Sequence, residues 1–455
     1  MELIAAIDNL LWGYLLVFLL LGVGILLTFV LRGIQFRMLG PALYLALIRR
    51  KEEGADGDIS HFQALMTALA ATVGTGNIVG VATAIAAGGP GALFWMWITA
   101  LFGMATKYSE ALLGVKYRHT DAAGEKSGGP AFYLTRGIAE VWNNGPGRAV
   151  GRVLGVLFAL FAAVAAFGIG NMVQANATAT NINNVTGIPR WVIGVVLVVL
   201  AAAVILGGIR SIGRFTAFFV PIMALFYVLA ATVVLIVNIE NLPGAIATVV
   251  SDAFTGTAAA GGFAGATVAA AIRFGVARGL FSNESGLGTG GIAAAAAQTS
   301  VPARQALVSM TQTFIDTIVI CSFTGLAIVS TGVWTESDDP GVLTQMAFSE
   351  SIGGIGPVLV AVGLAFFAFS TVLGWAYYGE RNLEYLFGRV AVTPYRLIFI
   401  AAIFVGTVRE LESLFLISDL MNGLMALPNL IGLILLSGVV ARETRDYFRR
   451  AGRQV

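Results

Sequence analysis

Residues 74–77 of the chain read Gly-Thr-Gly-Asn and lie in the middle of a long apolar stretch, residues 62–88. Two glycines around a threonine make a poor continuous helix in lipid, so we expect the chain to unwind there. Unwinding would free the N–H groups of Thr75 and Gly76 at the N-terminus of a half-helix, where they suit a carboxylate. The alternative is that these small residues only let neighbouring helices pack closely.

Oxygen atoms suited to a cation occur in the same stretch and in a later one. Carbonyls freed on the turn before the break, at Ala70 and Val73, suit a hard cation such as sodium. In the apolar stretch 354–379 the hydroxyls of Ser370 and Thr371, with the carbonyl of Phe367, would complete a five-oxygen site. A Ser-Thr pair alone usually bonds back to its own helix, so the combination carries the prediction.

A second stretch, residues 262–298, is too long for one uninterrupted span. Two interruptions are possible, at 275–279 and at 282–290. We favour the first for the substrate, which makes Phe274 and Gly275 candidate binding residues. The second interruption would line the inner pathway.

One phenylalanine and two amide side chains are predicted to share one face of the stretch 152–181. Phe167, Asn171 and Gln174 follow one another at i, i+4 and i+7. Phe167 would cap a small side chain, while Asn171 or Gln174 would meet an amino group. An interhelical polar clamp explains the two amides equally well.

Ionisable residues inside apolar stretches are costly and mark functional sites by default. Asp316 lies near the centre of 302–332, and Arg273, Arg278 and Glu284 lie in the interrupted stretch. The structural interpretation pairs Asp316 with Arg278. The alternative is a proton relay through Asp316 in place of sodium.

Composition places the chain in the membrane. Of its 455 residues 57% are hydrophobic and 11% are charged, and the mean hydropathy is +0.85. So little charge cannot cover a water-facing surface. The net charge of +2 comes from scattered basic residues, which argues against nucleic acid as a partner. One cysteine and two histidines argue against disulfides and intramembrane haem, copper or zinc, and no HExxH, GxSxG or paired-Asp motif indicates an enzyme.

Apolar stretches of spanning length recur about eleven times. The first has an acidic preceding segment and is too long for a signal peptide, so we expect a retained helix. The least certain division separates the last two, near residues 409–412. The predicted spans are 10–31, 62–88, 91–114, 152–181, 189–207, 213–237, 262–298, 302–332, 354–379, 396–413 and 414–441.

Lys and Arg gather in alternate loops, which predicts an external N-terminus and a cytoplasmic C-terminus. The residues assigned to the cytoplasmic side include Lys107 and Arg381, whereas the loops 238–261 and 333–352 contain acidic residues and no Lys or Arg. An odd number of spans agrees with this orientation.

After the first helix the spans divide into two sets of five, which an inverted repeat would explain. The predicted organisation is an extra N-terminal helix and cytoplasmic loop (1–61), a first five-helix repeat (62–238), an external loop with a second repeat (239–441) and a basic tail (442–455).

The run from Gly88 to Gly103, GGPGALFWMWITALFG, resembles the signature of the alanine or glycine:cation symporter family along its whole length. Residues 74–77 and 283–288 also resemble the family, and the likeness covers nearly the full chain. One departure is Gly290-Gly291, where a small residue and proline are expected.

The resemblance implies an all-α membrane protein of the leucine-transporter class, with a five-plus-five inverted repeat and one extra N-terminal helix. It also implies sodium-driven import of alanine, and of glycine, across the plasma membrane. The carboxylate would bind at Thr75 and Gly76, and Asn77 matches a position that touches a second sodium in some relatives. Proton coupling through Asp316 and a passive channel are the alternatives. The predicted substrate residues are Thr75, Gly76, Asn77, Phe167, Asn171, Gln174, Phe274 and Gly275, and the predicted sodium ligands are Ala70, Val73, Phe367, Ser370 and Thr371.

Overall fold

The computed structural model describes residues 2–52, 54–121, 123–255, 267–337, 339–409 and 412–450, and they are almost entirely helical. A single two-stranded hairpin is described, on the loop after α6. The elements of the first half are α1 Glu2–Leu10, the π-helical turn η1 Leu11–Leu15, α2 Leu16–Val30, α3 Ile34–Leu47, α4 His61–Thr72, the π-helical turn η2 Gly76–Gly80, α5 Val81–Gly88, α6 Gly91–Lys116, β1 His119–Thr120, β2 Lys126–Ser127, α7 Pro130–Val141, α8 Gly145–Phe167, the π-helical turn η3 Gly168–Met172, α9 Val173–Thr186, α10 Arg190–Ile205 and α11 Gly208–Val237.

Helices also occur in both loops predicted to be external. α12 lies in the 238–261 loop and α17 in the 333–352 loop, where the apolar pattern was too short to predict a span. Residues 256–266, which include the predicted start of the seventh span, lie outside the described residues. The elements of the second half are α12 Leu242–Thr255, α13 Val268–Asn283, α14 Thr289–Ala295, α15 Pro302–Thr313, the π-helical turns η5 Phe314–Cys321, α16 Ser322–Thr331, the 3₁₀ turn η6 Val333–Thr335, α17 Pro340–Ile352, α18 Ile355–Phe387, the 3₁₀ turn η7 Arg389–Ala391, α19 Val392–Val408 and α20 Glu412–Arg450.

Seven helical segments among the described residues are long and apolar enough to cross a membrane. The bent pair α4–α5 adds an eighth if it is one span. α19 ends at Val408 and α20 begins at Glu412, so the last two predicted spans are separate helices. The total of eleven crossings and the inverted repeat stay predictions.

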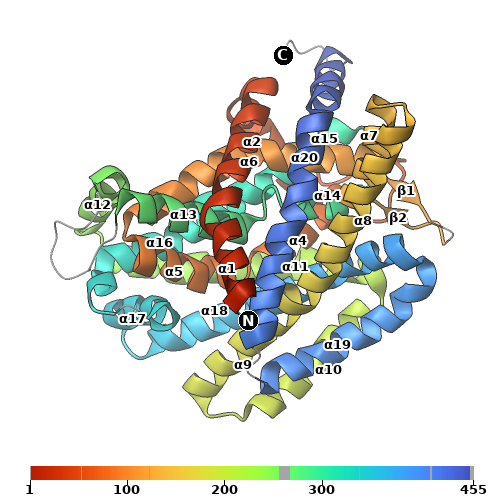
Figure 1. The fold of residues 1–455 in the computed structure, drawn as a ribbon. Helices are drawn as coiled ribbons and strands as arrows, with labels where there is room; N and C mark the ends of the chain where they lie inside the picture. The colour runs from red at the N-terminus through yellow and green to blue at the C-terminus, as the bar shows by residue number, and fades with distance from the viewer. Residues whose placement is uncertain are drawn as a thin grey trace.

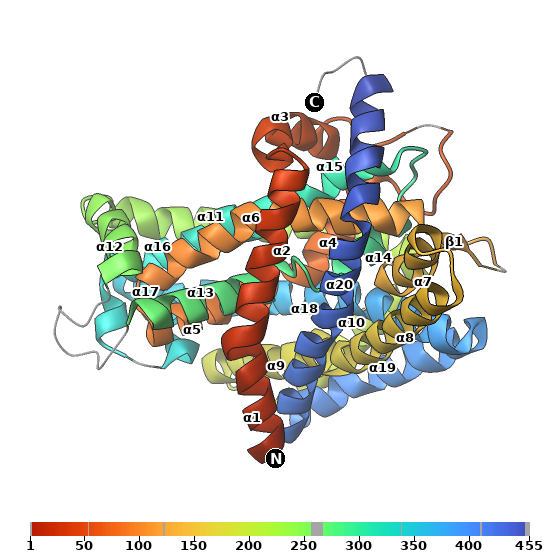
Figure 2. The ribbon, with the colours of Figure 1, turned by 45° about the horizontal axis from the view of Figure 1, so that its top comes forward.

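The long helices α1–α2 and α20 lie side by side along one flank of the molecule (Figures 1 and 2). The start of α1 and the end of α20 are at opposite ends of the molecule (Figure 2). This arrangement is compatible with an odd number of crossings, and the orientation of the chain in the membrane stays a prediction.

Two of the basic residues assigned to the cytoplasmic side are buried. Lys107 is 0% exposed and Arg381 is 1% exposed. Lys107 lies inside α6, where Glu110 is its ion-pair partner one turn later. Arg381 lies in α18 beside Glu380, Glu384 and Glu125. Sequence position alone does not show a buried partner, and the side of the membrane on which these two residues lie stays a prediction.

The first interrupted helix is confirmed. α4 ends at Thr72, Val73 is extended (φ −75°, ψ 92°), and the axis turns by 56° before the helix resumes through η2 and α5. The whole break is buried, and Val73 and Asn77 are 0% exposed. The unwound backbone is therefore enclosed by protein, the condition under which irregular backbone is tolerated at membrane depth.

The second interruption is at residues 284–288, and the expectation of a break at 275–279 is wrong. α13 runs without a break from Val268 to Asn283. Gly275 and Gly279 serve helix packing instead, because a Cβ at Gly275 would lie 2.3 Å from the Ala92 carbonyl oxygen of α6. The chain leaves the helix where Glu284, Gly286 and Gly288 adopt positive φ angles of 56°, 98° and 93°.

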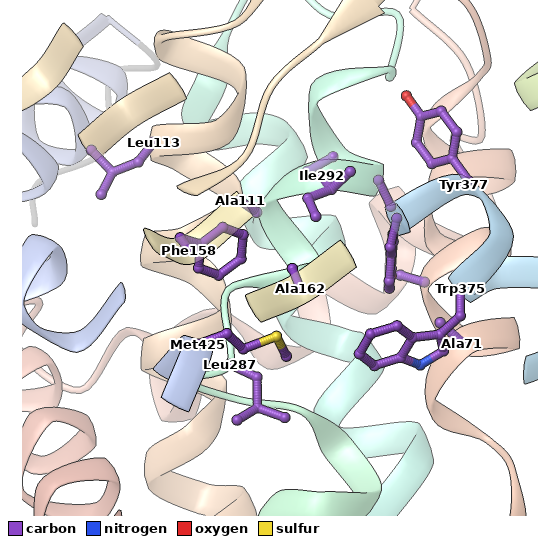
Figure 3. Packing of buried hydrophobic residues seen from close by; sticks show 14 of the residues in the cluster. Ala71, Ala111, Leu113, Phe158, Ala162, Leu287, Ile292, Trp375, Tyr377 and Met425 are labelled. Atoms are coloured by element: carbon purple, nitrogen blue, oxygen red, sulfur yellow. The ribbon is translucent and has the colours of Figure 1, made fainter. Parts of the chain in front are cut away.

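Packing around the second break joins segments that are distant in sequence. Figure 3 shows Leu287 of the 284–288 loop beside Met425 of α20, with Trp375 of α18 and Ala71 of α4 in the same cluster. All four side chains are at most 2% exposed. Both interrupted helices are thus held inside one apolar core.

Candidate functional site

The amides of the first break face a glutamine from α9. The Thr75 N–H donates to Gln174 Oε1 at 3.3 Å, and Gln174 Nε2 donates to Thr75 Oγ1 at 3.2 Å and to the Ile169 carbonyl at 3.1 Å. The structure therefore brings Thr75, Gly76 and Gln174 together, as the sequence predicted. A bound carboxylate could accept the hydrogen bonds that the Thr75 N–H and Gln174 Nε2 now donate to each other's side chains.

A narrow cavity lies at this point and is called the central cavity. Its volume is about 10 Å³, roughly the room that one water molecule needs. Both helix breaks contribute to its wall, together with α9, α18 and α20. The residues that surround it are Ala71, Thr72, Gly74, Thr75, Gly76, Ile169, Gln174, Phe281, Glu284, Leu287, Thr371, Trp375 and Asn422.

Five oxygen atoms converge between α4 and α18. Ser370 Oγ lies 3.3 Å from the Ala70 carbonyl, 3.4 Å from the Val73 carbonyl and 2.8 Å from the Phe367 carbonyl. Thr371 Oγ1 lies 3.3 Å from the Val73 carbonyl and 3.1 Å from the Phe367 carbonyl. All five residues are at most 3% exposed. Such a set of uncharged oxygens suits a hard monovalent cation.

Asn77 bonds to Gly74 of its own break and to Asp316. Its Oδ1 accepts the Gly74 N–H at 2.9 Å, and its Nδ2 donates to Asp316 Oδ1 at 2.8 Å. Asp316 Oδ2 accepts from Ser282 of α13 and from Thr317, both at 2.8 Å. Asp316 therefore links the two interrupted helices, and its predicted pairing with Arg278 is wrong. Arg278 lies against the Phe281 ring, 5.8 Å from the centroid.

Five of the predicted substrate residues do not line the central cavity, namely Asn77, Phe167, Asn171, Phe274 and Gly275. Phe167 packs on the rings of Tyr395 and Phe399, and Asn171 Nδ2 donates to the Phe399 carbonyl at 2.7 Å, so Asn171 acts as the interhelical clamp. The π-helical turn η3 lies between Phe167 and Gln174 and changes the helical phase, so the i, i+4, i+7 rule does not apply.

Phe274 and Gly275 lie within unbroken α13, away from the 284–288 loop. The residues of this helix that reach the first break are Phe281 and Ser282. A Cβ at Gly76 would lie 3.2 Å from the Ser282 Cα and 3.4 Å from the Phe281 ring. The displacement by two turns follows directly from the misplaced interruption.

A buried charge cluster, which the sequence prediction missed, holds the second break. Glu110 Oε1 accepts the N–H groups of Gly286 and Gly288 and the Asn429 side chain, each at 2.9 Å. Lys107 Nζ donates to the Glu284 carbonyl at 3.0 Å. The apolar stretch 91–114 carries both charges, and that signal could have identified the cluster.

Glu284 itself connects the loop to the central cavity. Its Oε1 accepts from Trp375 Nε1 at 2.9 Å and its Oε2 from Thr289 Oγ1 at 2.5 Å. Trp375 is thereby fixed across the cavity, while Gly170 packs directly behind its ring. Asn422 also lines this cavity, and its buried Oδ1 has no hydrogen-bond partner among the described residues.

Two interrupted helices that meet around a buried polar cavity, in a bundle of apolar helices, define a secondary transporter. The chain belongs to the sodium:alanine symporter family, which matches residues 1–454. It is thus a transporter and not an enzyme.

Named relatives are similar over almost the whole chain. The sodium/alanine symporter AgcS of Methanococcus maripaludis is 50% identical over 449 residues, covering 98% of this chain and 97% of the relative. An uncharacterized transporter of Haemophilus influenzae is 49% identical, covering 99% and 96%. A putative sodium/proton-dependent alanine carrier protein, YrbD of Bacillus subtilis, is 36% identical, covering 99% and 93%.

Proposed function

We propose that the protein is a sodium-coupled symporter that imports alanine, and glycine, across the plasma membrane by alternating access. The observation that carries this proposal is the five-oxygen cluster between α4 and α18. One of its members, Val73, directly precedes Gly74, which lines the central cavity. Membership of an amino-acid symporter family supports it.

The cation and the substrate share the same piece of backbone. Val73 supplies a carbonyl to the cluster, and the next residue, Gly74, lines the central cavity. Thr371 belongs to both, since its Oγ1 donates to the Val73 carbonyl and the residue lines the central cavity. Sodium bound at the cluster would hold α4 against α18 and orient the free amides, so that cation binding favours substrate binding.

The amino acid would lie across the break. Its carboxylate would accept from the Thr75 and Gly76 amides at the start of η2 and from Gln174. Its ammonium would donate to Asn422 Oδ1, the buried acceptor without a partner. Phe281 and Trp375 leave little room for a side chain, which favours alanine and glycine over larger substrates.

The energetics suffice for accumulation. A membrane potential of 100 mV is worth about 2.3 kcal/mol per elementary charge, so one sodium per substrate could sustain a gradient of roughly fifty-fold before the sodium gradient is added. In the proposed orientation, with the N-terminus outside, the repeats 62–238 and 239–441 would rock about the central cavity to release both solutes inside.

Uptake by proteoliposomes tests the coupling. We expect an inward sodium gradient to raise the initial rate of labelled alanine uptake at least tenfold over an equal choline gradient. Ser370→Ala should remove most of this stimulation, because it deletes the hydroxyl at the centre of the cluster. Equal uptake in both gradients would exclude sodium coupling.

Proton coupling is the second candidate, favoured by the buried Asp316 that joins Asn77 of one broken helix to Ser282 of the other. We expect Asp316→Asn to keep sodium-driven uptake within about fivefold of wild type, since an amide can retain hydrogen bonds to these partners. Loss of uptake together with loss of proton-gradient stimulation would favour the proton relay. Asp252→Asn, in α12, is the control for removal of a carboxylate.

Unitary currents far above carrier turnover would instead identify a channel.

A further inference from the structure

A second cavity, called the outer cavity, lies next to the central cavity and has a volume of about 120 Å³. Its walls come from α1 and η1, from α13 and from α20. Phe281 lines both cavities, and its ring lies against Gly76 of the first break. One aromatic side chain therefore separates the outer cavity from the proposed substrate site.

The outer cavity contains charges of both signs. Asp8 of α1 and Asp419 of α20 supply two carboxylates, and Arg273 and Arg278 of α13 supply two guanidinium groups. The four residues are all partly buried.

These charges do not pair with one another. No Arg273 or Arg278 nitrogen lies within 4.0 Å of a carboxylate oxygen in the described part of the chain. The buried Oδ1 atoms of Asp8 and Asp419 accept no hydrogen bond from any residue that the structure describes. Arg273 instead lies over the Tyr14 and Phe274 rings and reaches Asn9 Oδ1 at 3.4 Å.

Opposite charges that share a small, partly desolvated cavity attract one another strongly, and leaving them apart is costly. A ligand with both an ammonium and a carboxylate would satisfy both sets at once. An inorganic cation or anion would satisfy only one set. The cavity has room for several water molecules, which suits a ligand of a few heavy atoms.

We propose that the outer cavity is a second binding site for a small zwitterionic amino acid, which holds the substrate one step before it passes Phe281 into the central cavity. Asp8 and Asp419 bind the ammonium, and Arg273 and Arg278 bind the carboxylate. The site is built by the extra N-terminal helix, where the π-helical turn η1 places Trp12 to donate from Nε1 to the Asp419 carbonyl at 3.2 Å. This inference rests on the proposed amino-acid transport.

Binding stoichiometry on the wild-type protein is the first test. The full chain in lipid nanodiscs, in sodium buffer, is titrated with radiolabelled alanine by equilibrium dialysis. We expect two alanines per chain, the second binding at least tenfold more weakly. A single saturable site would overturn the inference but leave transport intact, whereas no saturable binding would remove the proposed function as well.

Variants then assign the weaker site. Asp8→Asn combined with Asp419→Asn, and separately Arg278→Gln, should abolish the weaker site and raise the KM for uptake about tenfold, with less than a twofold fall in kcat. Gln174→Ala should abolish the tighter site and leave the weaker one. Glu2→Gln is the control, because Glu2 is on the same helix and does not line the cavity.

A purely structural role predicts a different pattern. If the outer-cavity variants weaken both sites together, or lower kcat without changing KM, the charges only hold α1, α13 and α20 together and the inference is wrong. The same conclusion follows if all variants retain two unchanged sites. Should the double variant fail to fold, Arg278→Gln and the wild-type stoichiometry still decide the question.

Discussion

At the scale of single residues, Gly74 connects the two proposed ligands because no side chain fits at its position. A Cβ there would lie 2.4 Å from Thr371 Oγ1 and 3.3 Å from Gln174 Oε1. These two side chains belong to the oxygen cluster and to the substrate cavity respectively. The glycine thus permits close approach of α18 and α9 to the unwound backbone, a role that does not depend on its φ angle.

We therefore expect Gly74→Ala to raise the KM for sodium at least tenfold and to raise the KM for alanine as well. The added methyl group must displace Thr371 from the Val73 carbonyl. Gly80→Ala is the matched control: it lies in the same broken helix, and its nearest neighbour would be 4.0 Å from the new Cβ. Initial uptake rates over a range of sodium concentrations measure both variants. Wild-type sodium dependence in Gly74→Ala would contradict the proposed coupling.

At the scale of elements, the unwound loop 284–288 survives at membrane depth because α6 supplies its missing hydrogen-bond partners. Glu110 accepts two of the loop N–H groups, and Lys107 donates to one of its carbonyls. Asn429 of α20 donates to the Gly286 carbonyl at 2.8 Å. Three side chains from two helices, α6 and α20, thus satisfy a backbone that lipid could not.

Glu110→Ala should destabilise the protein by about 3–5 kcal/mol, the usual result of removing one partner of a buried ion pair. It leaves Lys107 without its carboxylate and two loop N–H groups without an acceptor. Thermal unfolding of the purified protein, followed by tryptophan fluorescence, measures the loss. The control is Glu140→Ala, whose carboxylate forms an exposed 3.6 Å pair with Arg442 and should contribute at most about 1 kcal/mol. Equal stability of the two variants would show that the loop does not need Glu110.

At the scale of the whole molecule, the proposed sodium site joins α4 of the first predicted repeat to α18 of the second. A ligand that binds only the folded state stabilises it by RT ln(1 + [L]/Kd), about 2.7 kcal/mol at one hundred times Kd. Bound sodium should therefore stabilise the contact between the two halves, in addition to driving transport.

We expect saturating sodium to raise the unfolding temperature of the wild-type protein relative to potassium at equal ionic strength. Ser370→Ala should lose this difference. Ser330→Ala is the control, since its hydroxyl donates only within its own helix, to the Ala327 carbonyl at 3.4 Å. An equal sodium effect in Ser370→Ala would place the binding site elsewhere.

The sequence by itself determined the features that are local in the chain. Glycines around Thr75 predict the first break, because the low helix propensity of glycine depends on the local sequence alone. The same holds for the apolar stretches and for the backbone and hydroxyl oxygens of the proposed cation site, whose five members the fold brings together as predicted.

Only the tertiary structure decided which glycines break a helix and which pack against a neighbour. Gly275 looks like a breaking residue in sequence, yet α6 passes beside it and needs the space. The real break begins at Glu284 because Lys107, Glu110 and Asn429, far away in the chain, replace the hydrogen bonds that the 284–288 backbone loses. Contacts between distant segments carry no short-range pattern, so the partners of the loop 284–288 and the gathering of charges in the outer cavity could be found only in three dimensions.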